Sequence, residues 1–122
     1  MLIGAALTPL AAPLAGCGQA GKVPAEPAPA AGQVLTTTAD VPVGEARIVD
    51  GTVVSQPTPG VFMGFAARCT HAGCALAVKD GGLECPCHGS KFSIEGTVER
   101  GPATDPLAPR TITVRDGDIV AG

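Results

Sequence analysis

Four of the five cysteines and both histidines of this 122-residue chain fall between positions 69 and 88. They form two short segments, Cys69-Thr70-His71-Ala72-Gly73-Cys74 and Cys85-Pro86-Cys87-His88-Gly89-Ser90. Thiolate sulfur and imidazole nitrogen are the ligands with which proteins bind zinc and some iron–sulfur clusters. Scattered structural residues would not gather in this way, so the pattern indicates a metal centre.

Two kinds of metal centre are open to these residues. A structural zinc ion could be held by four thiolates, or by two thiolates and two imidazoles, which would make the chain a zinc-stapled binding module without a redox role. The spacings do not match those of a zinc finger, and zinc gives no role to the turns expected at Gly73 and Gly89. The alternative is an iron–sulfur cluster, which would carry electrons.

The elements around the two segments are expected to be β-strands. From Val41 onward, short apolar runs alternate with turn residues, and no segment keeps a helical period over three turns. Asp50-Gly51 and Asp116-Gly117 favour type I′ hairpin turns. We therefore predict an all-β, small antiparallel domain. The expected strands are 43–49, 52–55, 61–67, 75–78, 83–85, 91–94, 97–100, 111–115 and 118–120.

Both segments resemble the two boxes of the Rieske 2Fe–2S family, C-x-H-x-x-C and C-x-C-H-G-S, and the resemblance covers about residues 41–120. It implies a Rieske-type fold with a cluster-binding subdomain of two loops and one 2Fe–2S cluster as cofactor. It also implies that Cys69 and Cys85 bind one iron and that His71 and His88 bind the other. By the same resemblance, Cys74 and Cys87 pair as a disulfide between the loops.

Four further residues acquire expected roles from this resemblance. Gly89 would let the backbone approach the inorganic sulfides, and Ser90 would donate its hydroxyl to a bridging sulfide. Phe92 occupies a position where high-potential members have tyrosine. We therefore predict a reduction potential below that of quinol-oxidising relatives and above that of plant-type ferredoxins. Pro102 lies in residues 101–107, which resemble the family's proline loop over the cluster.

One-electron transfer is the function that these residues predict. If both histidines bind iron, none remains for a catalytic triad or for an oxygenase site of two histidines and a carboxylate. We expect an electron carrier, with the iron–sulfur subunit of a cytochrome bc-type quinol oxidoreductase or of an exported molybdenum oxidase as alternatives. Phe92 and the short spacing of 13 residues between His71 and Cys85 favour the stand-alone carrier.

The N-terminal segment is expected to direct export and attach the protein to a membrane. Residues 1–16 are apolar and uncharged, and they are too short to span a bilayer. Leu14-Ala15-Gly16-Cys17 resembles the lipobox of bacterial lipoproteins, which implies lipidation of Cys17 and a location at the outer face of the cell membrane. Because no Lys or Arg precedes Cys17, an upstream in-frame start encoding Arg-Arg is expected.

Composition and charge complete the expected organisation. Residues 17–40 are rich in Ala and Pro and predict a flexible, extended tether, followed by the folded domain over residues 41–122. A net charge of −3 gives no basic footprint for nucleic acid and no polybasic membrane patch. With three Phe and no Trp or Tyr, so small a core is expected to need a metal or disulfide. Expected partners are a redox protein or a quinol-oxidising membrane complex.

Overall fold

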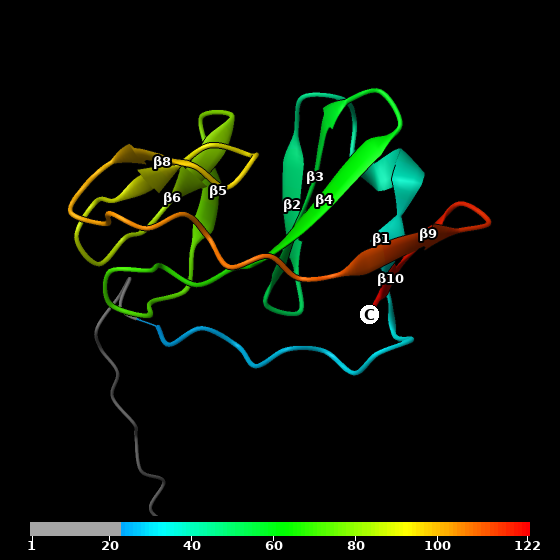
Figure 1. The fold of residues 1–122 in the computed structure, drawn as a ribbon, viewed down its shortest axis with the longest axis horizontal. Coiled ribbons are helices and arrows are strands. Elements are labelled where there is room, and N and C mark those ends of the chain that lie inside the picture. The colour runs from blue at the N-terminus through cyan, green and yellow to red at the C-terminus, as the bar shows by residue number, and fades with distance from the viewer. Residues whose placement is uncertain (1–22) are drawn as a thin grey trace, which may run out of the picture.

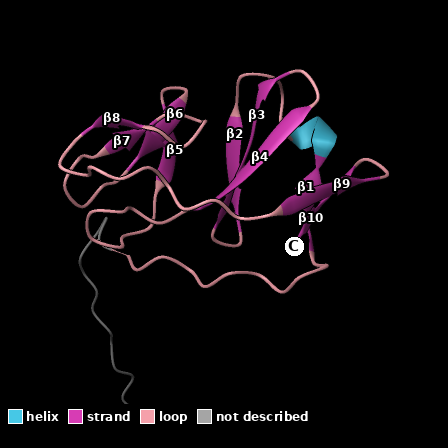
Figure 2. Cartoon of the chain, in the orientation of Figure 1, coloured by secondary structure: helices cyan, strands magenta, loops and turns pink. Residues whose placement is uncertain are grey.

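The computed structural model describes residues 23–122, which form three antiparallel sheets and one short 3-10 helix. The sheet formed by strands from residues 77–100 lies at one end of the molecule, the sheet formed by strands from residues 46–66 lies in the middle, and the sheet that contains the first and last strands lies at the end that holds the C-terminus (Figure 1). Strands and loops account for nearly all of the described chain (Figure 2). The predicted all-β antiparallel class is confirmed. Within residues 23–122, no helix is long and apolar enough to cross a membrane.

The first sheet joins the beginning of the folded chain to its end. Strand β1 (Val34–Thr37) pairs with β10 (Asp118–Ala121), which pairs with β9 (Ile112–Arg115). The helix η1 (Thr38–Asp40) follows β1 directly. This sheet contributes to a small apolar core of Leu35, Val41, Val54, Ile119 and Ala121.

The second sheet is the centre of the molecule, with the order β2 (Ala46–Val49), β3 (Thr52–Thr58) and β4 (Val61–Ala66). Successive side chains of its middle strand point to opposite faces of the sheet, and those of residues 52–56 are buried on both faces. Val53 packs into the core shared with the metal-site region, whereas Val54 packs into the core of the first sheet. Strand β3 therefore connects the two cores.

The third sheet carries the two cysteine–histidine segments. It consists of β5 (Ala77–Lys79), β6 (Gly82–Glu84), β7 (Lys91–Phe92) and β8 (Val98–Arg100), paired in that order. In the chain, this sheet and its loops stand between β4 and β9 as one continuous subdomain. All four strands are short, so the subdomain consists mainly of turns and loops.

Hairpins are present at both predicted Asp-Gly turns, and other expected strands form two more. Val49 pairs with Thr52 across Asp50-Gly51, whose positive φ values of 48° and 71° are those that a type I′ turn requires. The same Asp-Gly pattern with positive φ values closes the β5–β6 hairpin at Asp80-Gly81 and the β9–β10 hairpin at Asp116-Gly117. The fourth hairpin joins β7 and β8.

The ordered part of the domain begins before Val41. Residues 34–37, which the sequence analysis placed in the tether, form β1 and pair with β10. Gly32 already donates its N–H to the carbonyl of Ala121 at 2.7 Å. A four-residue strand in an Ala/Pro-rich stretch carries little local signal, because its stability comes from a partner strand more than 80 residues away. Residues 17–22 of the expected tether, with the predicted signal segment, lie outside the described residues.

Candidate metal centre

Two loops of the third sheet carry the candidate ligands, and their backbones follow the same hydrogen-bond pattern. In the first loop, between β4 and β5, Cys69 donates its N–H to Cys74 O at 2.9 Å and accepts from Gly73 N–H at 2.8 Å. In the second loop, between β6 and β7, Cys85 donates to Ser90 O at 2.8 Å and accepts from Gly89 N–H at 2.9 Å. Each candidate ligand cysteine therefore starts a closed turn.

A left-handed glycine completes each turn. Gly73 has φ 75° and Gly89 has φ 82°, which L side chains rarely adopt. A Cβ placed on Gly89 would meet no atom within 4 Å, so there is open space beside this backbone. The open space fits the expectation that Gly89 leaves room for a bound group next to the loop.

The four candidate ligands divide by burial. The side chains of Cys69 and Cys85 are each only 1% exposed and are not in a disulfide, whereas His71 and His88 are exposed. The two imidazole rings lie edge to face with their centroids 5.1 Å apart. The loops thus place two thiols inside and two imidazoles at the surface of one site.

The two buried thiols interact directly. Burial raises the pKa of the Cys69 thiol, but the His71 and Ala72 backbone N–H groups, with the Cys85 and Ser90 side chains, favour its thiolate and lower the pKa below the usual value. Burial and the neighbouring Cys69 raise the pKa of the Cys85 thiol. The backbone of the first loop thus already favours the charged form that a metal requires.

A disulfide between Cys74 and Cys87 joins the two loops across a sequence separation of 13. The pairing that the family resemblance implied is therefore present. Three sulfur atoms, those of Cys74, Cys85 and Cys87, lie within 4.8 Å of one another. Two of these sulfurs are bonded to each other and cannot act as thiolates, so this group is not a separate metal site, and a four-thiolate zinc site is not formed.

A third segment, the loop of residues 101–107, is hydrogen-bonded to both cysteine–histidine loops. Ala103 donates its backbone N–H to Ser90 Oγ at 3.0 Å, and Ser90 is fully buried. Thr70 donates its hydroxyl to Asp105 O at 2.7 Å. Pro102 lies exposed beside Ala103 in this segment. The segment that resembles the family's proline loop is thus hydrogen-bonded to both cysteine–histidine loops.

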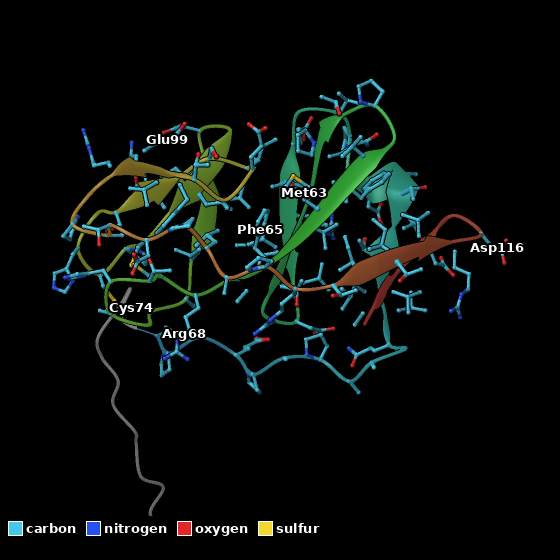
Figure 3. The ribbon with its side chains drawn as sticks, in the orientation of Figure 1. Met63, Phe65, Arg68, Cys74, Glu99 and Asp116 are labelled. Carbon is cyan, nitrogen blue, oxygen red and sulfur yellow. A yellow bond between two sulfur atoms is a disulfide. The ribbon has the colours of Figure 1, made fainter. Side chains whose placement is uncertain are left out.

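Thr70 and Asp105 were not among the residues singled out from the sequence. The sequence contains only a weak signal for this contact, because nothing in the residues around Thr70 indicates that its hydroxyl bonds to a residue 35 positions later. Both residues also line a hollow of about 590 Å³ beside His71, together with Arg68. Figure 3 shows Arg68 and Cys74 on the same side of the molecule.

Phe92 lies in β7 and is fully buried. Its backbone pairs with Leu83 of β6 and Val98 of β8, so the ring belongs to the core beneath the loops. Phe92 is therefore an aromatic residue of the core of this subdomain. Cys17, the candidate lipidation site, lies outside the described residues.

The donor set fits a two-iron cluster of mixed ligation. Two adjacent buried thiols and two adjacent exposed imidazoles provide four ligands on facing loops, in an arrangement that a disulfide holds together. The Ser90 oxygen accepts the N–H of Ala103, and the Ser90 side chain also hydrogen-bonds to the Cys69 thiol, so its hydroxyl already faces the candidate ligands. These loops can bind such a group with its nitrogen-bound side toward the surface.

Comparison with protein families gives a match over most of the folded chain. The model of the Rieske [2Fe-2S] domain matches residues 30–114. Among curated proteins, the cytochrome b6-f complex iron-sulfur subunit of Gloeobacter violaceus is 37% identical over 103 residues, covering 83% of this chain and 50% of that protein. The corresponding subunit of Chlorobaculum tepidum is 34% identical over 86 residues, covering 66% of this chain and 48% of that protein. This chain spans about half the length of these relatives.

Solved structures show the same fold. The plasma membrane Rieske protein of the cyanobacterium Synechocystis PCC 6803 superposes with a TM-score of 0.62 at 28% identity, covering 73% of this chain and 97% of that one. A Sphingomonas yanoikuyae B1 ferredoxin superposes with a TM-score of 0.56 at 27% identity, covering 74% of this chain and 96% of that one.

Proposed function

Because the chain belongs to the Rieske [2Fe-2S] family, we propose that it transfers single electrons through a cluster held by Cys69 and Cys85 on one iron and by His71 and His88 on the other. The observation that carries this assignment is the pairing of two buried thiols with two exposed imidazoles 5.1 Å apart. A zinc-stapled binding module, the alternative from another class, is not supported by this family membership.

The residues around the ligands suit a centre that changes charge by one electron. When bound, a Rieske cluster supplies a reversible one-electron couple, at roughly −150 to +300 mV for the family. The Ser90 hydroxyl can donate toward the cluster because its oxygen is already held by Ala103 N–H. The disulfide and the 101–107 segment restrain both loops, which limits rearrangement when the charge changes.

Electrons would enter and leave at the histidine side. His71 and His88 are the exposed ligands, whereas the cysteines are covered by the core of the subdomain. The hollow next to His71 gives a partner protein or a small redox molecule access to that imidazole. We therefore place the electron-exchange surface at these two residues.

The protein is further proposed to work outside the cytoplasm, attached to the membrane through a lipid on Cys17. The apolar segment before Cys17 supports this proposal, and so does the Cys74–Cys87 disulfide, since disulfides persist in oxidising compartments. Replacing Cys17 with Ser should move the protein from the membrane pellet to the soluble fraction. An unchanged distribution, or an unmodified Cys17 by mass spectrometry, would argue against the lipid anchor.

A second candidate is the iron–sulfur subunit of a quinol-oxidising cytochrome complex. Its support is the name of the curated relatives, which are subunits of cytochrome b6-f complexes. The stand-alone carrier is supported by the match to the Sphingomonas yanoikuyae B1 ferredoxin, of which this chain covers 96%. Copurification of the tagged full chain from gently solubilised membranes distinguishes the two, since the subunit would bring cytochromes with it.

The ligand assignment is tested by paramagnetic resonance of the reduced protein purified without air. The wild type should give a signal with an average g value below that of the free electron, and His71→Ala and His88→Ala should each abolish it. Thr104→Ala, which changes an exposed residue of the neighbouring segment, is the matched control and should keep the signal. An intact centre in either histidine variant would refute the assignment.

A further inference from the structure

We propose that residues 23–33, called here the N-terminal strap, are a positioning element that holds the first cysteine–histidine loop in place. The strap is the first described segment of the chain, and the expectation from sequence was a flexible, extended tether. Figure 1 shows it running along one side of the domain, from the start of β1 to the loop that follows β4. The inference concerns this chain's own loop and rests on the proposed function only where loss of the cluster is measured.

At the loop end, the strap adds a short antiparallel backbone pairing next to the disulfide. Ala75 donates its N–H to Val23 O at 2.8 Å, and Ala25 donates to Gly73 O at 3.4 Å. Pro24 forms the bridge with Cys74. Since Cys74 O also accepts the N–H of Cys69, the strap borders the same turn that presents the first thiol ligand.

The middle of the strap packs against the turn between β2 and β3. A Cβ added to Gly51 would lie 2.9 Å from Glu26 Cβ and 3.0 Å from Glu26 O. Gly51 is buried although it stands at the tip of a hairpin, where residues are ordinarily exposed. The strap therefore covers this turn closely.

The end of the strap is attached to the first sheet. Gly32 donates its N–H to Ala121 O at 2.7 Å, immediately before β1 begins. Ala28, Pro29 and Ala31 line a mainly apolar hollow of about 190 Å³ together with Leu35 and Ile112 of the first sheet. The strap is thus held at three places along its length.

The composition of the strap suits docking as well as extension. Pro24, Pro27 and Pro29 restrict φ and favour an extended chain before it binds. A pre-extended segment loses less conformational entropy when it lies down on a surface. The Pro/Ala pattern that predicted a tether is therefore compatible with a docked strap.

The consequence is a mechanical connection between the N-terminal segment and the metal site. The described chain begins at Val23 beside Cys74, not at β1 on the far side of the domain. Displacing the strap would free the N–H of Ala75 and the carbonyl of Gly73 and uncover the disulfide region. We expect faster opening of the first loop, faster reduction of the disulfide and faster loss of the cluster.

A matched pair of glycine variants in the full chain tests the proposal. Gly51 and Gly117 are both the second residue of an Asp-Gly hairpin turn, with φ values of 71° and 82°. Alanine creates similar backbone strain in both turns. However, only Gly51→Ala forces a Cβ into the strap, since Gly117 has no atom within 4 Å of that position.

The readouts are hydrogen exchange of the Ala75 amide and the rate at which a thiol reductant opens Cys74–Cys87. Gly51→Ala should raise both rates on the order of tenfold over the wild type, because overpacking at the strap is relieved by its release. Gly117→Ala should leave both rates within about twofold. Equal rates in the two variants would overturn the proposal.

Two further measurements keep the test decisive if Gly51→Ala fails to fold. In the wild type, the Ala75 amide should be protected, since its acceptor belongs to the strap, and an unprotected amide would refute docking. Replacing both Pro27 and Pro29 by Gly should raise the exchange rate of the Ala75 amide several-fold. The reason is that glycine gives the released strap more conformational entropy to lose on docking than proline does. Pro59→Gly, in the β3–β4 turn outside the strap, should not raise it. Neither amide exchange nor disulfide reduction depends on electron transfer, so failure here is distinct from failure of the proposed function.

Discussion

At the scale of single residues, the candidate ligands differ in burial, since the two cysteines are buried and the two histidines are exposed. Among the described residues, no buried side-chain nitrogen or oxygen lacks a hydrogen-bond partner. Ser90 is the most informative case, because it is fully buried between the second loop and the 101–107 segment. Its oxygen accepts the backbone N–H of Ala103, and its hydroxyl hydrogen-bonds to the Cys69 thiol at the metal site.

Replacing Ser90 with Ala should therefore lower both reduction potential and stability. Loss of one hydrogen bond to a charged centre, about 1.5–3 kcal/mol, corresponds to roughly 60–130 mV for one electron. The N–H of Ala103 loses its acceptor, which should reduce the free energy of unfolding by about 1–3 kcal/mol. Ser93→Ala is the control, since that hydroxyl bonds within its own hairpin to Thr97. Equal potentials for the Ser90 and Ser93 variants would contradict the role of Ser90.

Phe92→Tyr should raise the potential. The added hydroxyl can donate toward a cysteine sulfur, and a neutral hydrogen bond of about 0.5–1.5 kcal/mol corresponds to roughly 20–60 mV. Because Phe92 is fully buried, Phe92→Leu is needed to separate a packing change from the hydroxyl's effect. Protein-film voltammetry that shows no upward shift for Tyr relative to Phe and Leu would show that this position does not tune the potential.

At the scale of elements, the two cysteine–histidine loops belong to the same sheet and share one backbone hydrogen-bond pattern. Each begins at a buried cysteine that is bonded to the residues four and five positions later, and each includes a left-handed glycine. The sheet that carries them is attached to the central sheet through the β7–β8 turn. In that turn, Gly96 faces Phe65 of β4, and Ser55 of β3 donates its hydroxyl to Ile94 O at 2.7 Å. In Figure 3, Phe65 lies between the β2–β4 sheet and the β5–β8 sheet.

Gly96→Ala should weaken this junction. The new Cβ would lie 2.6 Å from Cε1 of Phe65 on a backbone with φ 86°. Overpacking and left-handed strain together should reduce the free energy of unfolding by about 2–5 kcal/mol. Gly44→Ala has a φ of 84° but open space around the Cβ, so only the strain of about 1–2 kcal/mol applies. Chemical denaturation that gives the same loss for both variants would show that the Phe65 contact is unimportant.

At the scale of the whole molecule, two small cores depend on different supports. The core of the first sheet, with Leu35 and Ile119, is closed by the pairing of β1 with the last strand, β10. The other core contains the candidate ligands Cys69 and Cys85 among its buried residues. Since the sheet above it is made of two- and three-residue strands, the metal and the disulfide must supply part of its stability.

Removing the metal should therefore destabilise the β5–β8 subdomain more than the sheet of β1, β9 and β10. Acid or chelator treatment, followed by return to neutral pH, should increase hydrogen exchange strongly in β5–β8 and in both loops. Exchange in β1, β9 and β10 should change little, because that core contains no candidate ligand. Exchange measured by mass spectrometry checks this, and a uniform increase over residues 23–122 would show that the two cores unfold as one unit.

The sequence by itself determined what is local. Residue types and spacing predicted the ligands and the family, of which the family is confirmed, and the Asp50-Gly51 and Asp116-Gly117 pairs located two hairpin turns because Asp and Gly favour the left-handed φ values of these turns. Only the tertiary structure decided which distant segments meet. The pairing of β1 with β10, the strap on Gly73–Ala75, and the bonds from Ala103 to Ser90 and from Thr70 to Asp105 join residues with no common local pattern. Their partners are chosen by burial and backbone hydrogen bonding across the whole chain, which no short window of residues records.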